Sequence, residues 1–127
     1  MRVVIMENTT WNLHELTTSI HQLLPKAPVK GFTDGNAALA WCLDHTSDVD
    51  LFLGNWWEED EETCGPEGAN IATLVPWRKR PQVILYADKE VFRKWSIQDG
   101  ANAFLLRPVT LPKLRETLEQ MDILKSQ

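Results

Sequence analysis

Short apolar runs alternate along most of the chain with stretches in which apolar residues recur at helical spacing. This alternation is typical of β-α units that form a parallel sheet covered by helices. The runs Val3–Met6, Val83–Tyr86 and Ala103–Leu106 consist almost entirely of apolar residues. A parallel strand has this composition because both of its faces are covered. Two further strands are predicted at 29–32 and 49–53.

Capping residues and prolines indicate where the first three helices begin and end. Thr9 or Thr10 can cap a helix that stops before Pro25, and Asp34 can cap a second helix that ends near His45. A third helix, at about 68–75, is stopped by Pro76. The predicted inner faces of the first two helices are Leu13, Leu16, Ile20 and Leu23, and Ala37, Ala38, Trp41 and Cys42.

Two more helices complete the pattern. Asp88 is the predicted N-cap of the fourth, and Gly100 ends it. The last helix runs from about 111 to 124. Five strands and five helices make a (βα)5, flavodoxin-like α/β fold. The predicted inner residues are Val91, Phe92, Trp95 and Ile97 in the fourth helix, and Leu114, Leu118, Met121 and Ile123 or Leu124 in the last.

Length and composition favour one globular domain, assigned to residues 1–124 with a tail at 125–127 that could begin a linker to an effector domain. No apolar run can span a bilayer and no signal peptide is evident, so a cytoplasmic location is expected. Cys42 and Cys64 lack CxxC spacing and are predicted to be reduced thiols. A formal charge of −5 argues against direct nucleic-acid binding by this domain.

Two segments resemble a known family, the response-regulator receiver (CheY-like) domains. The run 50–55 (DLFLGN) is similar to the strand that ends at the phosphoacceptor aspartate of receivers, and 100–108 (GANAFLLRP) to their Gly-Ala-x-x-Tyr/Phe-Leu-x-Lys-Pro segment. The resemblance extends from Arg2 to about Gln120. It implies a three-layer sandwich around a five-stranded parallel sheet in the order 2-1-3-4-5.

The resemblance also assigns the positions of the receiver phosphorylation pocket. Glu7 and Asn8 stand where the family has two metal-binding acids, and Asn55 stands at the phosphoacceptor aspartate. Tyr86, or Ala87 by a different count, replaces a small Thr or Ser, and Arg107 replaces the catalytic lysine. Two further positions follow the family pattern: Phe104 is at the aromatic switch, and Pro108 is the cis-proline candidate.

These substitutions predict a degenerate pocket, a pseudo-receiver. Asn55 carries an amide, which cannot act as the carboxylate nucleophile that forms an acyl phosphate. Mg²⁺ prefers charged oxygen ligands, so Glu7 alone is a weak metal candidate and no cofactor is expected. Arg107 has a planar, forked guanidinium that favours pairing with Glu7 over contact with a small phosphoryl group. No catalytic residue is therefore assigned, and the chain is not predicted to be an enzyme.

Some features near the pocket have two interpretations. Trp56 and Trp57 are either a partner contact or a hydrophobic lid over the pocket. The acidic run 58–62 is expected to be a solvated loop, although it could gather a cation or imitate a phosphate. His14 and His21 are too far apart for a metal pair, and Cys64 has no adjacent basic residue to activate it.

Three functions remain as hypotheses. The first is a pseudo-receiver that acts through phosphorylation-independent protein contacts, either alone or as the regulatory domain of a transcription factor. The second is a divergent active receiver that binds Mg²⁺ through Glu7 and loop acids and is phosphorylated on another residue. The third is a flavodoxin-like small-molecule binder. By resemblance, a protein partner or a homodimer would use the fourth helix, fifth strand and fifth helix, which carry Arg93, Lys94, Trp95, Gln98 and Arg115.

Overall fold

A computed structural model describes residues 1–57 and 65–125. Its five strands form one parallel sheet in the order β2-β1-β3-β4-β5, which confirms the predicted fold class and strand order. The strands are β1 (Val3–Met6), β2 (Val29–Phe32), β3 (Leu51–Asn55), β4 (Gln82–Ala87) and β5 (Ala103–Leu106). The helices are α1 (Thr10–Leu23), α2 (Gly35–Leu43), α3 (Gly68–Leu74), α4 (Phe92–Gln98) and α5 (Leu111–Gln120).

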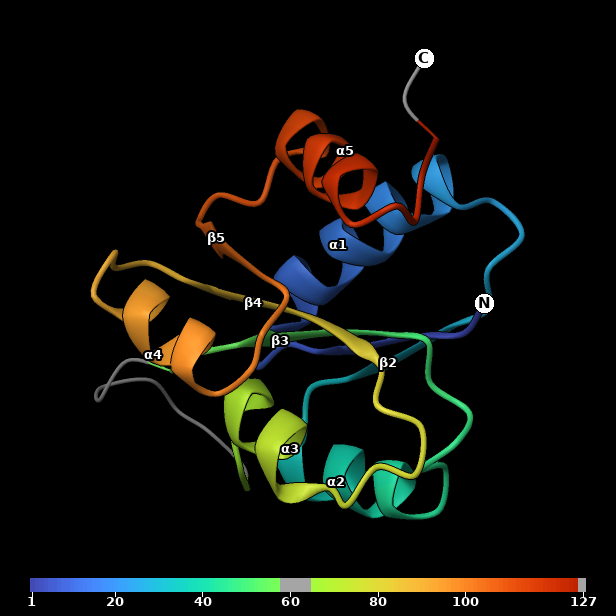
Figure 1. Ribbon diagram of the computed structural model, residues 1–127, viewed down its shortest axis with the longest axis vertical. Coiled ribbons are helices and arrows are strands. Elements are labelled where there is room, and N and C mark those ends of the chain that lie inside the picture. Colours follow the sequence, from blue (N-terminus) through green and yellow to red (C-terminus); the bar gives the residue numbers. More distant parts are fainter. Residues whose placement is uncertain (58–64, 126–127) are drawn as a thin grey trace.

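The sheet lies between two layers of helices (Figure 1). Helices α1 and α5 cover one face, α2 and α3 cover the other, and α4 lies near β4 and β5. Each face has its own apolar core, because alternate residues of the central strands point to opposite sides. Every residue of β1 and β3 is buried, as expected for strands covered on both faces.

Several predicted boundaries are confirmed and others need correction. Thr9 is the N-cap of α1, where its hydroxyl accepts a hydrogen bond from the amide of Asn12, and Asp34 caps α2. The third strand begins two residues later than predicted, at Leu51, and the last helix ends at Gln120. Ala37 was wrongly placed on the inner face of α2, since it is exposed.

The prediction for α4 was wrong in two respects. Asp88 does not cap this helix, which begins at Phe92 after an irregular turn. Three of the predicted inner side chains point outward: Val91 is 56% exposed, Trp95 45% and Ile97 54%. Ser96 is the buried residue of α4. Two helical turns are too few for apolar spacing to determine which side faces the sheet.

Backbone segments of β3 and α3 touch where the strand ends. A Cβ atom added to Gly68 would lie 2.4 Å from the Cα of Gly54 and 2.7 Å from the amide nitrogen of Asn55. Because both of those atoms belong to the backbone, no side chain can move to make room. The two glycines therefore set the distance between α3 and the end of β3, next to Asn55.

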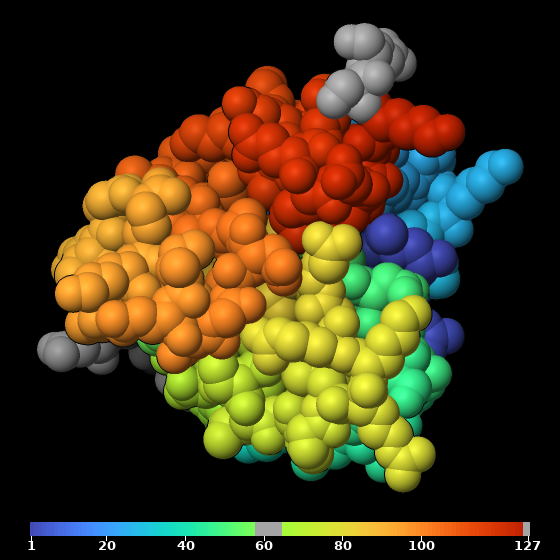
Figure 2. Space-filling view, viewed as in Figure 1, coloured from blue at the N-terminus to red at the C-terminus, as the bar shows by residue number. Residues whose placement is uncertain are grey.

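Two sequence expectations can be compared with the described part of the chain. No helix within residues 1–57 and 65–125 combines the length and apolar character that crossing a bilayer needs. Cys42 is a free thiol in the core between the sheet and α2, and burial raises its pKa to about 12. This thiol therefore remains protonated at neutral pH. Figure 2 shows the packed surface of the molecule, with α4 in orange projecting at one side.

Candidate functional site

The predicted pocket residues come together at the carboxyl ends of the strands, where ligands bind in open α/β sheets. Glu7 directly follows β1 and Arg107 directly follows β5. Asn55 and Tyr86 are paired residues on β3 and β4. The structure divides these side chains between two hydrogen-bonded clusters.

The first cluster is centred on the buried carboxylate of Glu7. Arg107 donates a charge-assisted hydrogen bond to Oε1 of Glu7, and the hydroxyl of Tyr86 donates to the same oxygen at 3.2 Å. The other oxygen, Oε2, accepts from the backbone amide of Thr9 at 2.8 Å and from its hydroxyl at 3.2 Å. Both carboxylate oxygens are thus engaged by protein groups, and the predicted pairing of Arg107 with Glu7 is confirmed.

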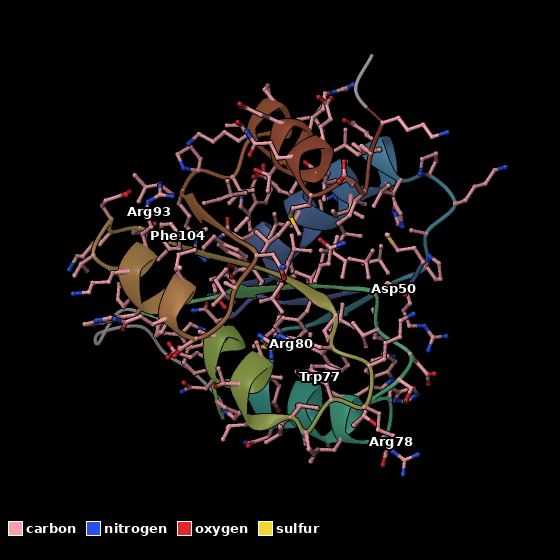
Figure 3. The ribbon with its side chains drawn as sticks, viewed as in Figure 1. Asp50, Trp77, Arg78, Arg80, Arg93 and Phe104 are labelled. Atoms are coloured by element: carbon pink, nitrogen blue, oxygen red, sulfur yellow. The ribbon has the colours of Figure 1, made fainter. Side chains whose placement is uncertain are left out.

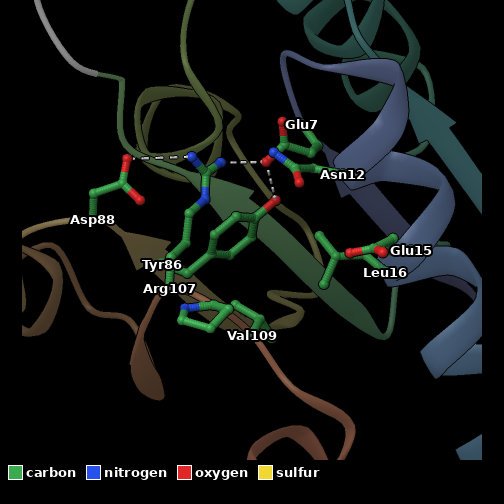
Figure 4. A pocket seen from close by; sticks show the side chains of 9 residues that line it. Glu7, Asn12, Glu15, Leu16, Tyr86, Asp88, Arg107 and Val109 are labelled. Atoms are coloured by element: carbon green, nitrogen blue, oxygen red, sulfur yellow. Dashed lines mark hydrogen bonds and ion pairs between the residues drawn. The ribbon is translucent and has the colours of Figure 1, made fainter.

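Arg107 has further contacts that hold it in place. Its second terminal nitrogen lies 3.6 Å from a carboxylate oxygen of Asp88, and its guanidinium carbon lies 5.3 Å from the centre of the Tyr86 ring (Figure 4). Its side chain is only 17% exposed. The guanidinium is therefore shared between two acids and an aromatic ring, and Asp88 has this role instead of the predicted helix cap.

Tyr86, rather than Ala87, is the β4 residue that reaches this cluster. Tyr86 pairs with Asn55 in the strand register, and its hydroxyl points to Glu7. Its pKa is raised well above the usual value, first by burial and then by the negative charge of Glu7, while Arg107 opposes the shift. The phenol is therefore a neutral hydrogen-bond donor.

The alkaline titration of Tyr86 offers a direct test, because the sequence contains a single tyrosine. In the unfolded chain its phenol should ionise near pH ~10. The folded state keeps the proton to higher pH. The free energy of unfolding is therefore unaffected below the pKa of the unfolded chain, and it falls as the pH rises above that value. We expect tyrosinate absorbance to appear together with loss of the circular-dichroism signal. Ionisation in a protein that is still folded would contradict the buried hydrogen bond.

The second cluster surrounds Asn55, which is buried at the end of β3. Its amide nitrogen donates to the side-chain oxygen of Asn8 at 2.6 Å, and its oxygen accepts from the indole nitrogen of Trp57 at 3.2 Å. The backbone amide of Trp57 in turn donates to the carboxylate of Glu67 at 2.8 Å. Trp57 therefore covers Asn55, in agreement with the lid interpretation for this tryptophan.

Among the described residues, the donor set at this strand edge is not the group of charged oxygens that Mg²⁺ prefers. Glu7 supplies the one carboxylate at the two positions after β1, and a guanidinium is already bound to it. Asn8 and Asn55 are bonded to each other and carry no charge. Within residues 1–57 and 65–125, no group of three or more His, Cys, Asp or Glu side chains is placed to hold a metal ion. Mg²⁺ would have to displace Arg107 from a buried carboxylate.

Trp56 connects the end of β3 to α4. Its indole nitrogen donates to the buried hydroxyl of Ser96 at 2.7 Å, and its ring stacks on Phe92 at 5.2 Å between centroids. Trp95 lies 6.1 Å from Trp56 in the same aromatic group. The sequence did not single out Ser96, although it is a small polar residue among apolar ones in this helix.

Phe104 and Pro108 are the two positions that follow the receiver pattern. In the sequence, Phe104 precedes Arg107 and Pro108 follows it. The ring of Phe104 is buried, and the guanidinium carbon of Arg93 lies 5.0 Å from its centre (Figure 3). The peptide bond between Arg107 and Pro108 is cis. His14 and His21 are exposed on α1. The acidic run 58–62 and Cys64 lie outside the described residues.

Comparison with solved structures agrees with this geometry. The response regulatory domain of protein mrkE from Klebsiella pneumoniae has a TM-score of 0.80 at 18% identity, over 97% of this chain and 96% of that one. The signal receiver domain of the DNA-binding response regulator merR from Colwellia psychrerythraea 34H has a TM-score of 0.74 at 19% identity, over 97% and 98%. A probable response regulator/GGDEF domain protein has a TM-score of 0.74 at 18% identity, over 96% of this chain and 50% of that one.

The chain therefore has the fold of CheY-like receiver domains. No family model and no curated sequence matches it, so the likeness is structural.

Proposed function

We propose that this chain is the pseudo-receiver domain of a two-component response regulator. It lacks the phosphoacceptor aspartate and acts through protein contacts that do not depend on phosphorylation. The observation that carries the proposal is the closed pair of clusters: Arg107 is bound to buried Glu7, while Asn55 is bonded to Asn8 and Trp57. Among the described residues, a phosphoryl group would find an amide at position 55 in place of a carboxylate nucleophile, and an arginine that is already bound to Glu7.

Intact-mass analysis after incubation with acetyl phosphate and Mg²⁺ tests the missing chemistry. We expect no phosphoryl adduct on the wild-type chain. The matched control is a variant in which Asn8→Asp, Asn55→Asp, Tyr86→Thr and Arg107→Lys restore the receiver side chains, and this variant should acquire a labile adduct. An adduct on the wild-type protein would contradict the proposal, most directly if it mapped to Asn55.

Metal binding can be tested with the tryptophan that covers the site. Because the Trp57 indole bonds to Asn55, its fluorescence should change if an ion entered the pocket. We expect a flat response to Mg²⁺ in the millimolar range for the wild type and a saturable change for the restored variant. A saturable change in the wild type would support the alternative of a divergent, active receiver.

We further propose that the partner surface includes the outer side of α4. Trp95 and Ile97 on this helix and Val91 just before it are exposed, beside the basic residues Arg93 and Lys94. Exposed apolar side chains gathered on one helix indicate a contact surface. The occupant would be a second copy of the chain or another protein with an apolar, acidic face.

Sedimentation analysis distinguishes these two occupants. If a second copy binds, the wild type should dimerise, and Trp95→Ala should weaken the dimer more than Trp11→Ala, which removes a 71% exposed tryptophan from α1. A monomer would leave another protein as the partner. Dimerisation that appears only with beryllofluoride and Mg²⁺ would contradict phosphorylation-independent action.

A further inference from the structure

A hollow of about 350 Å³ lies beside Arg107, on the side that faces α1 (Figure 4). One wall is formed by Asn12, Glu15 and Leu16 from α1, and the opposite wall by Tyr86 and Arg107. This space lies beside the two closed clusters and was not predicted from the sequence. Its volume is sufficient for a small organic molecule.

The charges in the lining favour a cation. Three carboxylates, Glu7, Asp88 and Glu15, and one guanidinium line the hollow, so the lining is net negative. Glu7 and Asp88 share Arg107, whereas the carboxylate of Glu15 makes no hydrogen bond or ion pair with any described residue. The side-chain amide of Asn12 likewise has no partner among the described residues, and it can present its oxygen to the hollow.

The remaining lining of the hollow favours a ligand that carries an aliphatic chain. Leu16, Pro108 and Val109 supply apolar surface next to Glu15. A second hollow of about 430 Å³ continues the first along α1, with Glu15, Pro108 and Val109 shared by both. Glu15 therefore stands midway along a groove that has a polar side and an apolar side, which suits an extended ligand.

We propose that this groove binds an aliphatic primary ammonium ion, with the charged nitrogen between Glu15 and the oxygen of Asn12. The alkyl chain lies on Leu16, Pro108 and Val109. An inorganic cation would leave this apolar wall unused, and an anion would meet a lining that carries three carboxylates against one guanidinium. Binding of an ammonium ion in this groove does not depend on whether Asn55 accepts a phosphoryl group. The two proposals can therefore be tested separately.

The test is a titration of the wild-type chain followed by amide chemical shifts in ¹⁵N-labelled protein. Pentylamine is the probe, with pentanol and pentanoate as probes of matched length. We expect pentylamine to bind with a millimolar dissociation constant and to shift the amides of Asn12, Glu15, Leu16 and Val109. Equal binding of pentanol or pentanoate, or shifts confined to another surface, would overturn the proposal.

Two variants test whether the negative charge of Glu15 is responsible for binding. Glu15→Gln should weaken pentylamine binding about fivefold. Glu116→Gln removes the same charge from an exposed position on α5 and should leave binding unchanged. Equal effects of the two changes would overturn the proposal. A lysine blocked at both its α-amine and its carboxyl group tests whether the ammonium ion belongs to a protein or to a small molecule. Tighter binding than pentylamine would assign the site to a lysine side chain of another protein. Weaker binding would assign it to a free amine.

Discussion

Replacing Arg107 with methionine should lower the free energy of unfolding by about 3 to 5 kcal/mol, because it leaves the buried Glu7 carboxylate without its counter-ion. The hydrogen bonds from Tyr86 and Thr9 would remain, but they do not neutralise the charge. Urea denaturation of the variant and the wild type measures the difference.

Two comparisons separate this effect from a general loss of arginine contacts. Arg115 is exposed on α5, and Arg115→Met should change stability by less than about 0.5 kcal/mol. Adding Glu7→Gln to Arg107→Met removes the buried charge, so the double variant should recover much of the loss. The buried ion pair would be refuted as the cause if the double variant were no more stable than Arg107→Met, or if Arg115→Met cost as much.

The second large effect is expected at the contact between α3 and β3. Gly68→Ala would place a methyl group 2.4 Å from the Cα of Gly54, so α3 must shift or the sheet must distort. Overpacking of this kind costs about 1 to 3 kcal/mol, and the rigid backbone on both sides favours the upper end. Denaturant unfolding gives the magnitude. The shift should also disturb the nearby Asn55 amide in nuclear magnetic resonance spectra.

Gly31→Ala is the matched control for this substitution. A methyl group there would meet the side chain of Leu13 at 2.8 Å, and the flexible end of that side chain can move. Gly31 is also exposed on the edge strand β2, where alanine lowers the entropy of the unfolded chain. We expect a change below about 1 kcal/mol. Equal destabilisation by the two alanines would show that backbone contact is not the decisive factor.

Much of the fold could be predicted because buried parallel strands appear in the sequence as short, continuous apolar runs. The apolar runs of β1 and β4 follow from burial on both faces, and Asp34 caps its helix through purely local geometry. The pairing of Glu7 with Arg107 could also be predicted, since the shape and charge of a guanidinium limit its partners. Each of these inferences rests on burial or on the chemistry of one side chain.

The rest depended on distances between segments that are remote in sequence. Asp88 was assigned as a cap because it precedes a helical pattern, but the end of β5 brings Arg107 within reach of it. The bond from Trp57 to Asn55 requires the chain to turn back over the strand end, which composition does not reveal. In α4, spacing alone could not show that Ser96 faces inward.

The division of the pocket into two closed clusters determines what a single substitution at this strand edge could change. An acid at position 55 could no longer donate to the side-chain oxygen of Asn8, and Arg107 would still be held by Glu7. A single substitution at position 55 would therefore supply a carboxylate without freeing the cation that is bound to Glu7. A receiver-type site at this strand edge would therefore require changes in both clusters at once.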